Sequence, residues 1–211
     1  MKAMNLFFVC VVVLTFAACS NAEDDRFEEN SSTFELIKSL YGIESVSNVA
    51  DAGNVPTVTA EEMEGVLEAL RQNGNITHEC KSENVEGYFG EGGDRQSVKM
   101  IAEYQAHTRA GAYLEEIALC VSLNFNVDKN TVYYIGSTYS SSADLFIWKG
   151  YGASLSTTAG GGNVFTAITH LYFRVSDQEN CLVKVPVDFK GNYNFNTGCG
   201  TYNFALSHCR K

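Results

Sequence analysis

The sequence predicts an α+β protein in which two N-terminal helices pack on a large antiparallel β-sheet, folded as a sandwich or as a strongly curved sheet. Two observations lead to this class. Apolar residues recur at helical spacing in two segments before residue 75, and from residue 76 onward they alternate with polar residues. Short turns join the alternating segments, which favours antiparallel pairing. We expect residues 32–211 to form one globular domain.

Two capping boxes mark where the helices should begin. Ser32 and Thr59 are each followed three residues later by a glutamate, whose side chain can return to the first backbone N–H. Gly42 and Gly74 then stop the two helices. Apolar residues follow at helical spacing and form one stripe on each helix: Phe34, Ile37 and Leu40 on the first, and Met63, Val66, Leu67 and Leu70 on the second.

The strands are read from a period of two in the apolar residues. In the last long strand, Pro186 cannot donate a backbone hydrogen bond, so we expect this strand at an edge of the sheet or beside a bulge. The segments that alternate, or that are rich in strand-forming residues, are 97–107, 117–125, 131–136, 145–148, 164–175, 181–189 and 202–206.

The first 18 residues have the pattern of a signal peptide. Lys2 supplies a positive charge, and residues 6–16 (LFFVCVVVLTF) are almost entirely apolar. This run is too short to cross a hydrocarbon layer of about 30 Å, which takes roughly 20 residues, but it suits the apolar part of a signal peptide. Ala17 and Ala18 follow, and Cys19 comes directly after them.

The four residues Phe16-Ala17-Ala18-Cys19 resemble the lipobox of bacterial lipoproteins, although Leu is usual where Phe16 stands. The acidic stretch that follows, residues 20–25 (SNAEDD), resembles the surface-export signal of Bacteroidota-type lipoproteins. The resemblance implies a lipid on Cys19 and an outer-membrane location, facing either the periplasm or the cell surface. Residues 19–31 are then an acidic flexible linker. The alternative is ordinary secretion, with Cys19 as a bystander.

Charge and composition exclude some partners. The formal net charge is −10 and no Lys/Arg cluster occurs, so phosphate groups would be repelled and nucleic acid is not expected as a partner. No second apolar segment is long enough to span a membrane. We expect the lipid anchor to make the membrane contact, and the sequence carries no motif for a cofactor.

Seven cysteines must be assigned. Cys10 leaves with the signal peptide and Cys19 carries the lipid, so five remain in the domain. Export permits disulfides, but an odd number leaves at least one thiol unpaired within the chain. Cys120 lies within an alternating strand and is expected as a small, buried, free residue. One disulfide is expected among Cys181, Cys199 and Cys209, with the pairing left open.

The remaining residues suggest two possible sites, one that could bind a metal ion and one that could be catalytic. His78, Cys80, His208 and Cys209 could offer two nitrogens and two sulfurs to zinc, although their spacing is that of no known finger or ribbon. Cys199 could act as a nucleophile with His107, His170 or His208 as its base. Surface histidines and a disulfide are the simpler interpretation of both sets.

A third arrangement is a group of aromatic residues near Ser, Gly and Asn in the C-terminal half of the chain. Such side chains can stack on sugar rings or anchor a protein partner. Filling of the sheet interior is the alternative, since aromatic residues favour strands. The residues in question are Tyr139, Trp148, Tyr151, Tyr193 and Tyr202.

The sequence therefore favours a membrane-anchored lipoprotein whose domain is a non-enzymatic binding or adhesion module for a glycan or a protein. Two alternatives stay open. One is a thiol- or metal-dependent hydrolase, which would need Cys199 reduced and next to a histidine. The other is an inhibitor or immunity-type lipoprotein, which would have a tight protein partner and no turnover.

Overall fold

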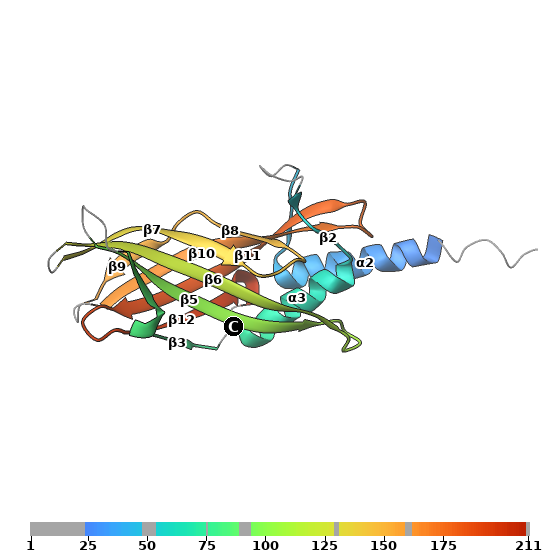
Figure 1. Ribbon diagram of the computed structural model, residues 1–211. Helices are drawn as coiled ribbons and strands as arrows, with labels where there is room; N and C mark the ends of the chain where they lie inside the picture. Colours follow the sequence, from blue (N-terminus) through green and yellow to red (C-terminus); the bar gives the residue numbers. More distant parts are fainter. Residues whose placement is uncertain are drawn as a thin grey trace, which may run out of the picture. The chain divides into compact units, whose positions relative to one another are not determined.

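The computed structural model describes residues 24–47, 54–74, 76–88, 94–128, 131–158 and 162–209. The chain divides into two compact units, Met1–Leu36 and Ile37–Lys211. The boundary falls within helix α2 (Asp24–Tyr41), which supplies the described residues of the first unit. The second unit holds both β-sheets and helix α3 (Ala60–Asn73) (Figure 1). Neither described helix combines the length and the apolar character needed to span a membrane.

The larger of the two sheets, called here the large sheet, has eight strands. Its main path is β2-β10-β11-β12-β3, with β1 paired to β11 and both β8 and β9 paired to β10. All pairs are antiparallel except β2 with β10. The strands are β1 (Glu44–Ser45), β2 (Thr57–Val58), β3 (His78–Lys81), β8 (Ile147–Gly150), β9 (Ser154–Thr157), β10 (Gly162–Val175), β11 (Cys181–Asn194) and β12 (Cys199–Leu206).

The small sheet has four antiparallel strands in the order β4-β5-β6-β7. They are β4 (Val85–Tyr88), β5 (Asp94–His107), β6 (Tyr113–Asp128) and β7 (Thr131–Ser141), and the 3-10 helices η2 (Ser82–Asn84) and η3 (Ser207–Cys209) complete the elements. Alternation correctly identifies the inward positions of β5 and β6. All of them are buried: Val98, Met100, Ala102, Tyr104, Ala106, Ile117, Leu119, Val121, Leu123 and Phe125.

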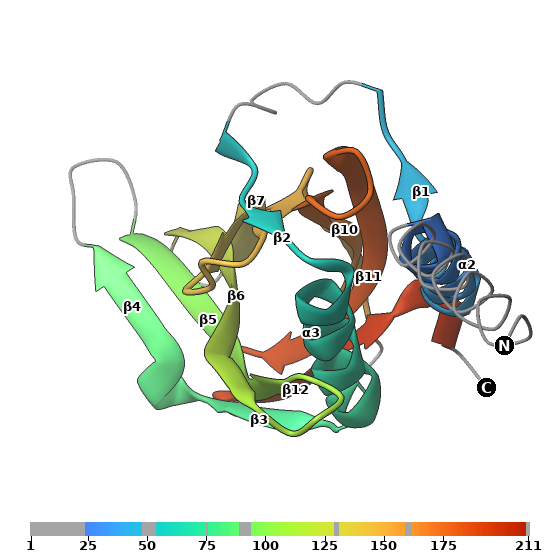
Figure 2. The same cartoon turned by 90° about the vertical axis from the view of Figure 1, so that its right-hand side faces the viewer.

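The two sheets face each other and share one apolar core (Figure 2). Phe125 on β6 meets Phe165 on β10 edge to face, with ring centroids 5.7 Å apart. At one seam, the Tyr202 hydroxyl on β12 donates to the Ile101 carbonyl on β5 and accepts from the Ile101 N–H at 3.1 Å. The sheets are therefore joined by hydrogen bonds as well as by apolar packing.

Helix α3 lies between the two sheets at one end of the core (Figure 2). The predicted capping box is confirmed: the Glu62 N–H donates to the Thr59 hydroxyl at 3.2 Å, and the Thr59 N–H donates to the Glu62 carboxylate at 2.8 Å. Its apolar stripe is buried, and so are residues outside the stripe: Ala60, Glu64, Gly65 and Ala69. Helix α3 is thus an interior helix, whereas a single stripe by itself implies one buried face.

The expected fold class is wrong, because the protein is mostly β rather than α+β. Antiparallel pairing is confirmed, but the strands form two sheets and not one. The helices do not make an N-terminal layer on a sheet, since α3 is enclosed by both. Alternation along a strand shows which side chains point inward, but it does not show how many sheets share that interior.

Two local expectations also need correction. Helix α2 begins at Asp24 and not after Ser32, although it ends as expected at Gly42, which has a φ of 63°. Strand β11 is not at an edge, because β10 pairs with it on one side and β12 and β1 on the other. Pro186 lies between the last pair with β12, at Val187, and the pair with β1 at Lys184. Its missing N–H therefore falls at a gap between two neighbours.

Candidate functional site

The structure separates the five aromatic residues that the sequence groups as ligand-binding candidates. Trp148, Tyr193 and Tyr202 lie in the core, with exposed fractions of 5%, 2% and 7%. Tyr139 is half-buried, and only Tyr151 is exposed, at 83%. The five side chains therefore do not form a shared surface patch. For the three core residues, filling of the interior is the better interpretation.

Trp148 shows why the core residues are unavailable to a ligand. Its indole N–H donates to the Thr169 hydroxyl at 2.7 Å, and that hydroxyl donates to the Val187 carbonyl at 2.9 Å. The ring is edge-on to Tyr139 and to Phe204, with centroid distances of 5.5 and 5.6 Å. Both the polar and the apolar parts of this side chain are therefore occupied inside the protein.

Tyr151 is presented by a short loop between β8 and β9 that is anchored on both sides. Gly150 packs so closely on Tyr139 that a Cβ would lie 2.6 Å from its ring. The Gly152 N–H donates to the Tyr139 hydroxyl, and the Ala153 N–H donates to the Tyr134 hydroxyl at 3.3 Å. Gly152 has a φ of 111°, which strongly favours glycine. The exposed ring therefore projects from a fixed backbone.

A hollow of about 470 Å³ with both polar and apolar walls adjoins this loop, on the outer side of the large sheet. Strand pairing places its side chains together: Thr166 of β10 lies opposite Ser154 of β9 and Lys190 of β11, and Ile168 lies opposite Asp188. We call Tyr151 and the hollow the Tyr151 site. The hollow is lined by Gly152, Ser154, Thr166, Ala167, Ile168, Asp188, Phe189 and Lys190.

The Tyr151 site offers several kinds of contact. Ile168, on the wall of the hollow, is 63% exposed and offers an apolar surface. The Asp188 carboxylate is held by a hydrogen bond of 2.8 Å from the Ser207 hydroxyl, and Lys190 carries a positive charge. Hydroxyls, a carboxylate and an ammonium group can together donate and accept hydrogen bonds. Such a surface suits a ligand that has both apolar faces and hydroxyl groups.

Next to the site along β10 lie two titratable residues, the half-buried His170 and the buried Tyr172. Burial lowers the pKa of His170, and the charge of Lys184 lowers it further. Burial also raises the pKa of Tyr172, and its hydrogen bond with Tyr151 raises it further. Both shifts favour the neutral form. His170 and Tyr172 therefore add no charge beside Tyr151 at neutral pH.

The expected disulfide is not formed in this structure. Cys181 and Cys199 are both free thiols, so no pair exists among Cys181, Cys199 and Cys209. The side chain of Cys209 lies outside the described part of the chain. Cys120 is free, as expected, but it is half-buried, with its sulfur 3.8 Å from the Ser122 hydroxyl.

Cys199 has no histidine beside it in the hollow where it lies. That hollow is lined by Glu79, Cys80, Lys81, Asn192, Cys199, Gly200 and Thr201. The three histidines proposed as a base lie elsewhere: His107 ends β5, His170 is within β10, and His208 is within η3. The described residues therefore do not assemble the thiol-histidine pair that a hydrolase of this type requires.

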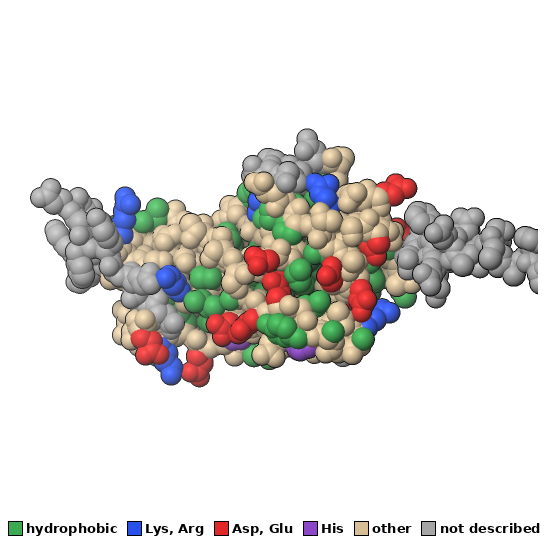
Figure 3. Space-filling view, turned by 45° about the vertical axis from the view of Figure 1, so that its right-hand side comes forward, with side chains coloured by type: hydrophobic (Ala, Val, Ile, Leu, Met, Phe, Trp, Pro, Cys, Tyr) green, Lys and Arg blue, Asp and Glu red, His purple; other side chains and the backbone are tan. Residues whose placement is uncertain are grey.

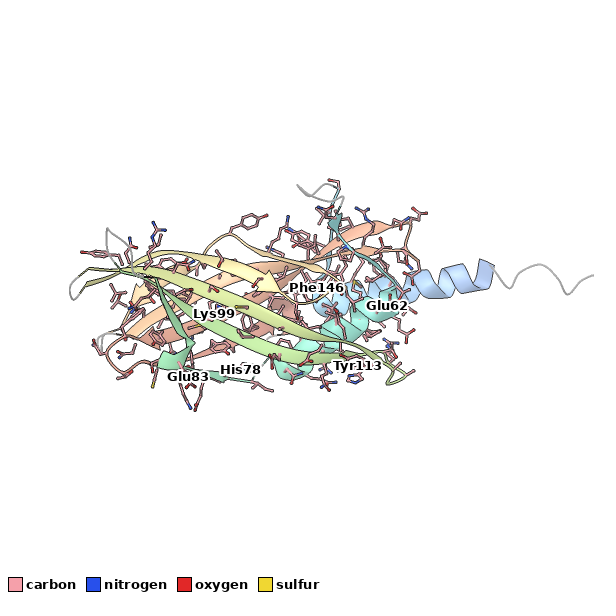
Figure 4. All side chains as sticks on the ribbon, viewed as in Figure 1. Glu62, His78, Glu83, Lys99, Tyr113 and Phe146 are labelled. Carbon is pink, nitrogen blue, oxygen red and sulfur yellow. The ribbon has the colours of Figure 1, made fainter. Side chains whose placement is uncertain are left out.

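Of the four zinc-ligand candidates, the two histidines lie at different places in the fold, and the side chain of Cys209 lies outside the described part of the chain. His78 stacks on Tyr202, with ring centroids 5.2 Å apart, and its place at the lower edge is shown in Figure 4. His208 follows the far end of β12 and packs at Gly42, where a Cβ would lie 2.3 Å from its ring. Within the described residues, no group of three or more His, Cys, Asp or Glu side chains is placed to hold a metal ion.

Sequence reasoning missed the residues that line the hollow. Thr166, Asp188 and Lys190 are the outward members of alternating strands, so their exposure was readable from the period of two. That these three residues lie close together could not be predicted, because it depends on the register between β9, β10 and β11. Cys19, the predicted lipid-bearing residue, lies outside the described residues.

The fold and the site together define a mostly β protein of two facing sheets, with an interior helix and a candidate binding surface on the large sheet. The chain belongs to the family described as Domain of unknown function (DUF5033), whose model matches residues 25–206. No curated protein and no solved structure matches the chain.

Proposed function

We propose that this protein is an exported lipoprotein whose domain binds carbohydrate at the Tyr151 site. The observation that carries the proposal is the exposure of Tyr151, at 83%, on a loop anchored by Tyr134 and Tyr139. A large aromatic side chain left in water on a fixed backbone loses little conformational entropy when it binds a ligand. This is the kind of residue that dominates binding energy.

The chemistry around the ring favours a sugar over other ligands. One face of a pyranose ring is lined by C–H groups and packs on an aromatic ring. Its hydroxyls can donate to the Asp188 carboxylate and accept from the Lys190 ammonium and the Thr166 hydroxyl. A protein partner would use the same exposed Tyr151 and Ile168. A protein ligand, as expected of an inhibitor-type lipoprotein, is therefore the second candidate.

The experiment is a glycan array followed by titration of the best glycan with wild-type protein and two variants. Tyr151→Ala should weaken binding by at least about tenfold, because the stacking surface is lost. Tyr133→Ala should bind like wild type, since Tyr133 is also exposed, at 56%, but lies on β7 of the other sheet. Equal binding by wild type and Tyr151→Ala, or no glycan binding by wild type, would contradict the proposal.

The anchor is a separate part of the proposal. We propose that the Cys19 thiol carries lipid and places the domain at the outer membrane, where glycans would reach a module facing the cell surface. The resemblance of residues 16–19 to a lipobox supports this. Stable attachment takes more than one acyl chain. The lipoprotein pathway places several chains on one cysteine, so the domain would stay membrane-bound.

Metabolic labelling with an alkyne fatty acid tests the anchor. Wild-type protein should be labelled and should sediment with membranes, whereas Cys19→Ala should be unlabelled. Cys10→Ala is the matched control, because Cys10 is removed with the signal peptide and its loss should leave labelling unchanged. Labelling of the Cys19→Ala variant would refute lipidation at this position.

A further inference from the structure

A second hollow, of about 360 Å³, lies where α3 meets the end of α2 and the turn between β5 and β6. We call it the α3 pocket, and its walls include Tyr41, Glu64, Glu68, Arg71, His107 and Arg109. We infer that the α3 pocket binds an alkylguanidinium group, such as an arginine side chain, which takes the place of Arg109 on the Glu64 carboxylate. This site is independent of the Tyr151 site, which lies on the outer side of the large sheet.

Glu64 is the group that would hold the ligand. Its side chain is only 9% exposed, and it is the one charged residue that is buried among the described residues. A buried carboxylate needs a cation, because leaving it unpaired costs far more than the ion pair itself contributes. Arg109 supplies that cation through a hydrogen bond of 2.5 Å from its Nη2 to Oε1 of Glu64.

Arg109 is held in the pocket more weakly than Glu64, the residue whose charge it neutralises. Its side chain is 62% exposed and comes from the turn between β5 and β6. An exposed arginine that joins an ion pair gives up side-chain entropy and gains little from packing. A ligand cation that enters the pocket can therefore replace Arg109 without leaving Glu64 unpaired. In this arrangement Arg109 occupies the site until the ligand arrives.

Glu68, one turn further along α3, shapes the wall of the pocket rather than binding the ligand. Its Oε1 accepts hydrogen bonds from Arg71 Nη2 at 2.5 Å and from Gln72 at 2.8 Å. Its Oε2 accepts hydrogen bonds from Arg71 Nε at 2.6 Å and from the Tyr41 hydroxyl at 3.0 Å. The hydrogen bond from Arg71 is the main reason that the pKa of Glu68 falls to about 2. With both oxygens occupied, Glu68 fixes Tyr41 and Arg71 in place.

The surroundings favour a planar organic cation. Tyr41 and His107 line the pocket, and His107 meets Tyr113 edge to face at 5.7 Å, at the same end of the protein as α3 (Figure 4). Guanidinium groups stack on aromatic faces and pair with carboxylates through two parallel hydrogen bonds. The space-filling view shows Asp and Glu side chains gathered on one face (Figure 3). The net charge of −10 also attracts cations.

The test is isothermal titration with N-acetylarginine amide and with N-acetylcitrulline amide, its neutral isostere. Wild-type protein should bind the arginine compound and not the citrulline compound. Arg109→Ala should bind it about fivefold more tightly, because the competing side chain is gone. It should also gain more melting temperature from the ligand than wild type does, because the ligand restores a partner to Glu64. A Gly-Gly-Arg-Gly-Gly peptide shows whether flanking backbone adds affinity, as it would for a protein ligand.

The double variant Glu64→Gln/Arg109→Ala keeps the pocket without a buried charge, so it should fold and should not bind the arginine compound. Tyr151→Ala should bind it like wild type, which separates this site from the proposed glycan site. The inference is overturned if Arg109→Ala binds more weakly than wild type, if the double variant still binds, or if the citrulline compound binds equally well.

Discussion

Replacement of Trp148 with alanine is expected to lower the free energy of unfolding by about 3–5 kcal/mol. The side chain is 5% exposed and packs against Tyr139 and Phe204, so its removal leaves a large cavity between the sheets. The change also leaves the Thr169 hydroxyl without its donor. Urea unfolding followed by far-ultraviolet circular dichroism measures the loss. Fluorescence is unsuitable because Trp148 is the protein's single tryptophan.

Tyr151→Ala is the matched control, because it removes an aromatic side chain from the loop that follows the same strand. Its stability should stay within about 0.5 kcal/mol of wild type, since Tyr151 is 83% exposed. Both residues are candidates for ligand binding by sequence, but the structure buries Trp148 and exposes Tyr151. A Trp148→Ala variant as stable as wild type would contradict the core position assigned to this tryptophan.

The second large effect is expected at Gly65, in the middle of α3. Gly65→Ala should lower the free energy of unfolding by about 1–3 kcal/mol, because a Cβ there would lie 2.4 Å from the His107 carbonyl oxygen and 2.7 Å from the Leu114 side chain. The same substitution improves helix propensity by about 1 kcal/mol. The sign of the measured change therefore shows whether close packing or helix propensity dominates at this position.

Gly136→Ala provides the control for this substitution. Gly136 lies within β7 and a Cβ built on it meets no atom within 4 Å. The alanine variant should be as stable as wild type or slightly more stable, because glycine loses the most backbone entropy on folding. If Gly65→Ala were stabilising to the same degree as Gly136→Ala, the close approach of α3 to the end of β5 would be refuted.

Local features were predictable where neighbouring residues in the chain decide them. The capping box at Thr59 closes within three residues, and the alternation in β5 and β6 requires only that successive side chains point to opposite sides. Gly42 ends α2 because its own backbone takes a positive φ. None of these depends on a distant partner, and all of them hold in the structure.

The candidate site depended on partners that are far apart in the sequence. Tyr151 and Trp148 lie three residues apart, beside similar neighbours, yet one is exposed and the other is buried. What separates them is the position of Tyr139 on β7, which packs against Trp148 and anchors the loop that carries Tyr151. The residues next to each aromatic side chain in the sequence do not predict that contact, so all five aromatic residues had to be treated alike.

By itself, the sequence determined the acidic charge, the long strands, the inward faces of β5 and β6, and the helix boundary at Thr59. The strands, their faces and the helix boundary depend on interactions over a few residues. Only the tertiary structure decided that there are two sheets, that α3 lies between them, and that Arg109 reaches Glu64 across 45 positions of the chain. Strand partners and buried ion pairs are chosen by packing of the whole core, and alternation along one strand is compatible with many such packings.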